Sequence, residues 1–199
     1  MKSISKFKNI SNTDIWNSEN IYHLKTDITR ISNLINHYEI YKKITSLPGD
    51  VVECGVFKGI SLTRFLTFRE ILENNNSRKI YGFDVFGKFP KPKNQSDKSF
   101  LKRWEKNAGD VKKTIPNLIK QQPHLKISLL HLDMDINEST KFVLNKLFSY
   151  VVRGGIILID DYNTVFGATK ATDEFLNLNK DLEIKKLNFY KKPSYIIKI

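Results

Sequence analysis

The sequence predicts an α/β protein with one open, mostly parallel β-sheet and helices on both of its faces. Short apolar runs at 51–56, 79–83, 127–132 and 156–159 alternate with stretches in which apolar residues recur at helical spacing. Such alternation is typical of repeated strand–helix units. Most of these runs lead into an acidic residue or a glycine-containing turn. Because parallel strands present their carboxyl ends along one edge, where ligands bind in open α/β sheets, a ligand site is expected there.

The N-terminal part is predicted to contain one amphipathic helix. Isoleucine, leucine and tyrosine residues recur on one face of residues 27–46, and a Pro-Gly pair then turns the chain. Residues 1–18 show no such pattern and are expected to be peripheral or poorly ordered. We therefore expect an N-terminal helical extension at 1–46 that packs on the core of a single α/β domain at 47–199.

The first half of that domain is predicted to begin with a strand, a glycine turn and a helix. The strand covers 51–56, the helix covers 61–72, and a second strand at 79–83 ends at Asp84. Beyond Asp84, the sequence favours a proline- and lysine-rich loop at 86–97 and helical pieces at 100–106 and 111–121.

The segment 127–162 carries the strongest pattern in the chain. It predicts a strand at 127–132, a helix at 139–152, a glycine turn at 153–155 and a strand at 156–159, which together form a βαβ unit. A helix near 170–178 and two strands at 183–187 and 194–199 follow. The last two strands are expected to pair antiparallel, because their connection is too short for a crossover helix.

Four carboxylates follow the two strands of the βαβ unit. Asp133 and Asp135 come after the first strand, and Asp160 and Asp161 after the second. Four carboxylates close together repel one another unless a cation, a proton or a basic substrate offsets their negative charge. The alternative is that Asp135, Asn137 or Asp161 merely caps a helix, which explains one acid after a strand but not two pairs. His131 lies inside a strand and is interpreted as a packed core residue, whereas His124 is expected to be exposed.

Bulk composition excludes several classes of protein. The 199 residues contain no apolar run long enough to cross a bilayer, and the N-terminus lacks the apolar core of a secretory signal. Cys54 is the only cysteine, so an intrachain disulfide and a cysteine-based zinc site are excluded, and a cytoplasmic location is expected. The net charge of +12 favours anionic partners, but the basic residues are scattered and no nucleic-acid-binding motif is present.

A cofactor site is predicted at the first two strand ends. Glu53, Gly55 and Gly59 lie on a strand–turn–helix, where glycines allow a ligand to approach the backbone and the helix offers free N–H groups. The acid before the first glycine would repel a pyrophosphate, so the turn favours a cofactor with a cationic centre, such as S-adenosylmethionine. Asp84, at the end of the next strand, can accept both hydroxyls of a ribose.

These motifs resemble those of the macrocin O-methyltransferase (TylF-type) family of S-adenosylmethionine-dependent enzymes, over about residues 47–198. The matching stretches are GDVVECGVFKGISLTRFL at 49–66, YGFDVFGKFP at 81–90, LLHLDMDINEST at 129–140, RGGIILIDDYNTVFGATKATDEF at 153–175 and PSYIIK at 193–198. The resemblance implies a Rossmann-like class I methyltransferase fold with bound S-adenosylmethionine and Mg²⁺. It also implies methylation of a hydroxyl on a sugar, a sugar nucleotide or a glycosylated natural product.

The resemblance also implies roles for individual residues. The cofactor would be held by Glu53, Gly55, Phe57, Gly59, Ser61, Asp84 and Asp133, and the metal by Asp133, Asp160 and Asp161. We assign Asp160 as the general base, with Asp161 as second choice. Asp135 is a candidate further ligand or holder of a metal-bound water.

One departure from the family pattern leaves an alternative function open. Between Asp84 and Asp133 the family has a further strand, but this sequence shows no convincing apolar run there, so an edge strand of the sheet is expected to be missing. The alternative to an active enzyme is therefore a cofactor-impaired relative that acts as a binding or assembly subunit. A basic nucleic-acid methyltransferase or binder is a third hypothesis. Neither membrane association nor nucleic-acid binding is expected, and a homodimer stays open.

Overall fold

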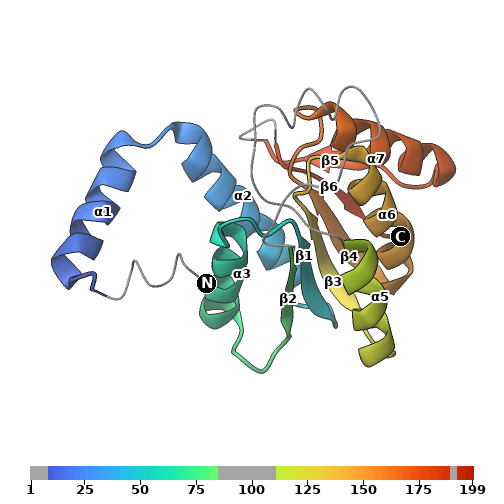
Figure 1. Ribbon diagram of the computed structural model, residues 1–199, viewed down its shortest axis with the longest axis horizontal. Helices are drawn as coiled ribbons and strands as arrows, with labels where there is room; N and C mark the ends of the chain where they lie inside the picture. The colour runs from blue at the N-terminus through green and yellow to red at the C-terminus, as the bar shows by residue number, and fades with distance from the viewer. Residues whose placement is uncertain (1–8, 85–110, 189–191) are drawn as a thin grey trace.

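The sheet has the mixed topology that the sequence predicts. The computed structural model describes residues 9–84, 111–188 and 192–199. Within these ranges six strands form one open sheet in the order β2-β1-β3-β4-β6-β5 (Figure 1). Strands β1 to β4 run parallel to one another, and β6 is antiparallel to both β4 and β5. The strands are β1 (Asp50–Cys54), β2 (Ile80–Phe83), β3 (Ile127–Leu132), β4 (Val151–Ile159), β5 (Ile184–Lys186) and β6 (Ser194–Ile197).

Helices cover both faces of this sheet, as Figure 1 shows. On one face lie α2 (Ile28–Ile44) and α3 (Ile60–Leu72), and on the other α5 (Val111–Gln121), α6 (Asn137–Leu147) and α7 (Phe166–Leu178). A 3₁₀ turn at Phe148–Tyr150 links α6 to β4.

The core is divided in two because neighbouring residues of a strand point to opposite faces. In β1, Val51 packs with the α2 and α3 side chains, while Val52 packs with those of α5 and α6. Leu129 and Leu130 of β3 divide in the same way. All six residues of β3 are buried, which explains its continuous apolar run.

Most predicted elements are confirmed. The helix at 111–121 and the strand at 127–132 have the bounds that the sequence predicts, and the helix predicted at 27–46 is α2. The predicted loop at 86–97, the helical piece at 100–106 and the stretch in which an edge strand is expected to be missing lie wholly or largely outside the described residues.

One helix was not predicted, and the segment 139–155 was predicted wrongly. Residues 12–25 form the helix α1 (Asn12–Lys25), which begins at a capping box between Ser11 and Asp14 and has no buried residue. Its apolar residues follow no helical stripe, so periodicity could not reveal it. The glycine turn predicted at 153–155 lies inside β4, because Gly154 donates to the Lys198 carbonyl and Gly155 accepts from the Lys198 N–H, which continues the ladder. The helix predicted at 139–152 therefore ends earlier, at Leu147.

One buried arginine, Arg78, links several helices and strands at the amino-terminal ends of the parallel strands. Its side chain is buried, with the residue only 6% exposed. Its guanidinium donates to both carboxylate oxygens of Glu73, at the end of α3, and to Ser128 Oγ in β3. It also donates to the backbone carbonyls of Ile44, Leu47 and Gly49, between α2 and β1. Four elements thus meet on a single side chain, at the end of the sheet opposite to the predicted site.

No helix in the described ranges is long and apolar enough to cross a bilayer.

Candidate active site

The turns after β1 and β3 are in direct contact. Gly55 has φ of +96°, and a Cβ on it would lie 1.8 Å from the carbonyl oxygen of Asp133. Its N–H donates to the Phe83 carbonyl, which extends the pairing of β1 with β2. Glycine is required here both by the positive φ and by the close approach of the second backbone. The turn predicted to hold the cofactor and the loop predicted to hold the metal therefore lie side by side.

Asp84 organises the turn after β1. Its Oδ2 accepts hydrogen bonds from the backbone N–H groups of Val56 (3.0 Å) and Phe57 (2.7 Å). Phe57 has φ of +49° and its side chain is 55% exposed. α3 then begins after Gly59, which has φ of +81° and gives no side-chain cap. The first N–H groups of α3 are therefore placed to meet a polar ligand.

Glu53 lies fully buried beneath that turn. Its Oε1 accepts a short hydrogen bond from the Ser61 hydroxyl, while Oε2 has no hydrogen-bond partner among the described residues. His131 Nδ1 lies 3.8 Å from Oε1. Glu53 and Ser61, both predicted to contact a cofactor, thus contact each other.

Three carboxylates after β3 and β4 form a compact group. Asp133, Asp135 and Asp161 each place one oxygen within 4.8 Å of the others. Partial burial and the neighbouring carboxylates raise the pKa of Asp135 to about 8, and the same causes raise the pKa values of Asp133 and Asp161. Asp135 has φ of +62°, a strained conformation for a residue with a side chain. We call these three residues the carboxylate group.

The fourth predicted acid, Asp160, faces a different set of side chains. One of its oxygens lies within 4.8 Å of a nitrogen of His37 and a nitrogen of His131. Burial acts to raise the pKa of Asp160, but His37, His131 and Lys192 together lower it well below its ordinary value. The structure therefore brings Asp133 and Asp161 together, as predicted, and adds Asp135 to them. Asp160 instead lies next to His37 and His131.

Lys192 supplies a positive charge that the sequence analysis missed. Its Nζ lies 3.5 Å from Asp160 Oδ2 and 3.5 Å from Asp161 Oδ1. Burial lowers the pKa of Lys192, but Asp160, Asp161 and Asp133 outweigh that effect and raise it, so the ammonium stays protonated. Lys192 precedes β6 and lies outside every recognisable motif, so only its place in the fold reveals it.

His37 is the other missed residue. It lies on α2 among apolar neighbours, is 1% exposed, and stacks on Phe65 at 5.2 Å between ring centroids. The buried position predicted for His131 is confirmed, since this side chain is fully buried, and His124 is exposed as expected.

The alternative in which the acids only cap helices is wrong. α6 begins after Ile136 and α7 after Val165, and neither helix receives a side-chain cap.

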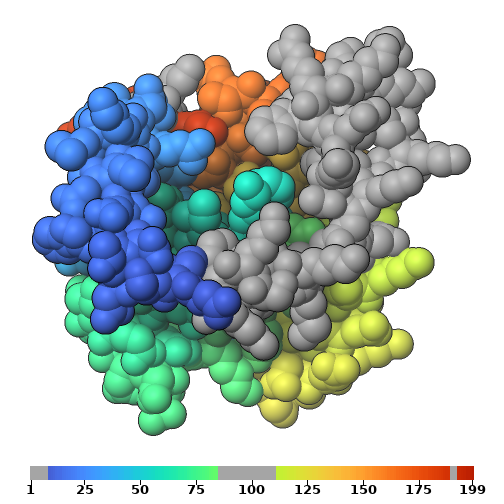
Figure 2. Space-filling view, turned by 60° about the vertical axis from the view of Figure 1, so that its left-hand side comes forward, coloured from blue at the N-terminus to red at the C-terminus, as the bar shows by residue number. Residues whose placement is uncertain are grey.

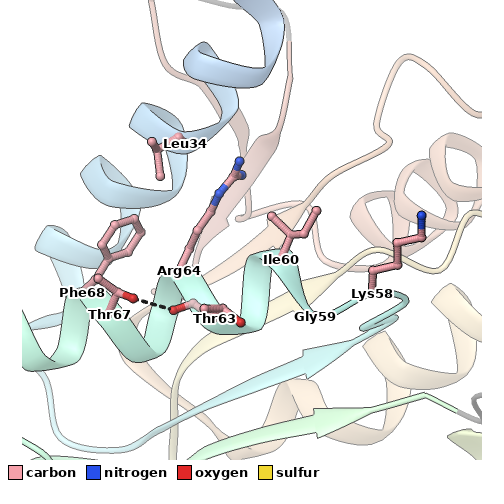
Figure 3. Close-up of a pocket in the computed structure, with 8 residues that line it drawn as sticks. All are labelled: Leu34, Lys58, Gly59, Ile60, Thr63, Arg64, Thr67 and Phe68. Carbon is pink, nitrogen blue, oxygen red and sulfur yellow. Dashed lines mark hydrogen bonds between the residues drawn. The ribbon is translucent and has the colours of Figure 1, made fainter. Parts of the chain in front are cut away.

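A pocket of about 390 Å³ opens between α2 and α3. In Figure 3, Lys58 on the turn before α3 and Arg64 on α3 extend upward, and Leu34 of α2 lies above α3. Burial lowers the pKa of Arg64, while Tyr22 of α1 and Asp160 of the acidic site act to raise it, so this guanidinium interacts electrostatically with the site.

In Figure 2 the blue surface of α1 and α2 borders a hollow beside the cyan residues that follow β1. The pocket is lined by Leu34, Lys58, Gly59, Ile60, Thr63, Arg64, Thr67 and Phe68.

Comparisons with known proteins agree with this architecture. The model of the macrocin-O-methyltransferase (TylF) family matches residues 107–187, which confirms the resemblance predicted from the sequence. No curated protein sequence matches the chain significantly.

Solved structures show the same fold. The calicheamicin methyltransferase CalS11 superposes with a TM-score of 0.77 at 23% identity, over 98% of this chain and 90% of that one. The O-methyltransferase NovP gives a TM-score of 0.63 at 21% identity, over 84% and 80% of the two chains. An S-adenosyl-L-methionine methyl transferase from Silicibacter pomeroyi gives 0.51 at 15% identity, over 96% and 99%. The class I methyltransferase fold predicted from the sequence is thereby confirmed.

Proposed function

We propose that this chain is an S-adenosylmethionine-dependent enzyme of the macrocin-O-methyltransferase (TylF) type. It methylates a hydroxyl group of a sugar, a sugar nucleotide or a glycosylated natural product with the help of Mg²⁺. The observation that carries the proposal is the contact between Gly55 and the Asp133 carbonyl. This contact brings the turn after β1 and a group of carboxylates together at the edge where open α/β sheets bind ligands, which supports one shared site.

The cofactor would lie across the ends of β1 and β2. Glu53 has a buried oxygen without a hydrogen-bond partner in the part of the chain that the structure describes, and such an oxygen favours a cationic ligand group. The ammonium of the methionine part provides that group. Asp84, which follows β2, holds the turn through Oδ2 and would accept the ribose hydroxyls.

The carboxylate group fits Mg²⁺, which prefers hard oxygen ligands. Three oxygens lie within 4.8 Å of one another, and Asp161 Oδ2 is a buried atom without a hydrogen-bond partner within the described ranges. Asp133 and Asp161 would hold the ion together with Asp135 or with Asp160. When bound, Mg²⁺ would lower the pKa of a coordinated hydroxyl group.

Asp160 remains the assigned proton acceptor. Its lowered pKa keeps it anionic across the neutral range, which is the form that accepts a proton. It is also a weak base, so it takes the proton only from a hydroxyl that its surroundings have already made more acidic. Lys192 holds Asp160 and Asp161 in place through contacts of 3.5 Å to each.

The pocket between α2 and α3 favours an acceptor that carries a negative charge. Two cationic side chains, Lys58 and Arg64, and two hydroxyls, Thr63 and Thr67, line a volume of about 390 Å³, which is within the range of small-molecule sites. Among the structural neighbours, CalS11 is a TDP-rhamnose 3'-O-methyltransferase. A sugar nucleotide is therefore our preferred acceptor among the three classes.

Calorimetric titration with S-adenosylmethionine and S-adenosylhomocysteine, each with and without Mg²⁺, tests the cofactor site. Micromolar binding supports the proposal, and no binding at millimolar ligand overturns it. Transfer of a labelled methyl group to neutral sugars, sugar phosphates and sugar nucleotides then identifies the acceptor class. If chelation of the metal leaves transfer unchanged, the role of Mg²⁺ is wrong.

A further inference from the structure

A second group of potential metal ligands lies beneath the carboxylate group. His37 of α2, His131 of β3 and Asp160 after β4 each place one ligand atom within 4.8 Å of the others. Their exposed fractions are 1%, 0% and 7%, so all three side chains are taken out of water. The distance from His37 Nε2 to Asp160 Oδ1 is 3.8 Å.

Most polar atoms of this group have no hydrogen-bond partner among the described residues. Both ring nitrogens of His37, both of His131 and Asp160 Oδ1 are buried without a hydrogen-bond partner there. Leaving a buried polar atom unpaired costs about 1–3 kcal/mol each, and such atoms in folded proteins are nearly always satisfied by a partner, a water or an ion. Three of the five, one from each residue, lie within 4.8 Å of one another and therefore indicate a bound species.

Aromatic packing closes the group on one side. The Phe65 ring stacks on His37 and meets His131 edge-on at 5.4 Å. The two imidazoles lie 5.2 Å apart, with their planes inclined by 71°. Since the rings are fixed by packing, their nitrogens are held in position for a ligand.

We propose that His37, His131 and Asp160 bind a transition metal ion, Zn²⁺, at a site distinct from the Mg²⁺ site. Two imidazole nitrogens and one carboxylate oxygen suit Zn²⁺, whereas the all-oxygen carboxylate group suits Mg²⁺. The anions Asp160 and Glu53 balance the charge of the ion, and Glu53 Oε1 lies 3.8 Å from His131 Nδ1, where it orients the ring. The ion fastens α2 to the centre of the sheet.

Asp160 is shared between the two sites. Its Oδ1 faces His37, while its Oδ2 lies 3.5 Å from Lys192, which also contacts Asp161 of the carboxylate group. Zinc at the histidines therefore fixes the orientation of the side chain that we assign as proton acceptor. This consequence rests on the proposed function, but the zinc site itself does not.

The test measures zinc on the full chain. Chelator-treated protein is dialysed against Zn²⁺ in a large excess of Mg²⁺, which keeps the carboxylate group filled, and its metal content is determined by mass spectrometry. We expect one zinc per chain, and Co²⁺ in its place should give the visible absorption of a tetrahedral nitrogen–oxygen site.

Variants locate the ion. His37→Gln and His131→Gln should weaken zinc binding by about 100-fold or more, whereas Glu53→Gln, which removes an orienting contact and a balancing charge but no ligand atom, should weaken it by about 10–100-fold. His124→Gln, an exposed histidine, should leave it unchanged. Asp135→Asn should reduce Mg²⁺ binding while zinc stays, which separates this proposal from the methyltransferase site.

Substoichiometric zinc in the wild type, or equal zinc in His37→Gln, overturns the proposal. A crystal structure of zinc-treated protein with only a water between the imidazoles does the same. Should His131→Gln fail to fold, as judged by circular dichroism, His37→Gln and the Co²⁺ spectrum of the wild type still decide the question.

Discussion

The backbone of Gly55 and the carbonyl oxygen of Asp133 lie so close that a Cβ at position 55 would stand 1.8 Å from that oxygen. Gly55→Ala must therefore push the turn after β1 away from the loop after β3. We expect a loss of more than about 2 kcal/mol in the free energy of unfolding, from strain and displacement together, and loss of cofactor binding.

Gly59→Ala is the matched control for this change. Gly59 also has a positive φ, of 81°, but a Cβ there meets no atom within 4 Å. Only the conformational cost of about 1–2 kcal/mol applies. Denaturant unfolding of both variants measures the difference, and equal destabilisation would show that the contact with Asp133 is unimportant.

Asp135 should contribute more to Mg²⁺ affinity than the sequence predicts, because the family resemblance implies Asp133, Asp160 and Asp161 as the metal ligands. It belongs to the carboxylate group by geometry, whereas Asp160 faces the histidines. Asp135→Asn should therefore weaken Mg²⁺ binding at least as much as Asp160→Asn does. Titration calorimetry with Mg²⁺, supported by Mn²⁺ electron paramagnetic resonance, compares the two variants. A large loss in Asp160→Asn alone would favour the ligand set that the sequence implied.

The metal-free protein should become less stable as the pH rises through the neutral range. Folding raises the pKa of Asp135 from 3.8 to about 8, so the folded chain holds more protons than the unfolded chain between these values. The stabilisation is complete below the unfolded pKa and is lost as the pH rises through the folded one. Thermal unfolding in a chelator at increasing pH should show a falling Tm.

Two controls accompany that pH series. Asp135→Asn should flatten the slope because the titrating group is gone, and Mg²⁺ should raise Tm most at the alkaline end. A Tm that rises with pH in the chelator would contradict the proposed repulsion within the carboxylate group.

Lys192 should stabilise the empty site and compete with the metal. Its ammonium lies 3.5 Å from both Asp160 and Asp161, so Lys192→Gln leaves two buried carboxylates without that cation. We expect a lower Tm without metal and a larger increase in Tm on addition of Mg²⁺ than in the wild type. Lys180→Gln, at an exposed position, serves as the control. If both variants respond alike to Mg²⁺, Lys192 does not act on the site.

The sequence predicted the parts of the fold that rest on local patterns. The apolar run of β3 and the periodicity of α5 give their bounds directly, and the four acids after β3 and β4 mark the edge that holds the site. α1 escaped prediction because it buries nothing and thus has no apolar stripe. The glycines at 154 and 155 were misplaced because their hydrogen bonds run to Lys198, a contact that only the folded sheet creates.

The composition of the site could be predicted only in part, for a similar reason. Asp133 and Asp161 follow strands in a motif, whereas His37 and Lys192 reach the site from α2 and from the segment before β6. No local pattern marks either residue, because their chemical meaning comes from tertiary neighbours. The division of the acids between two groups depends on which way Asp160 points, and a sequence motif does not encode that direction.

The hydrogen bonds of Arg78 have a consequence for how new specificities can arise on this scaffold. They tie α2, α3, β1 and β3 together at the amino-terminal edge of the sheet, opposite to the edge that holds the carboxylate group. Loops at the opposite edge can therefore be lengthened, shortened or exchanged without releasing these bonds. Grafting a loop from another methyltransferase at that edge should alter substrate choice while the backbone amides near Arg78 keep their protection from hydrogen exchange.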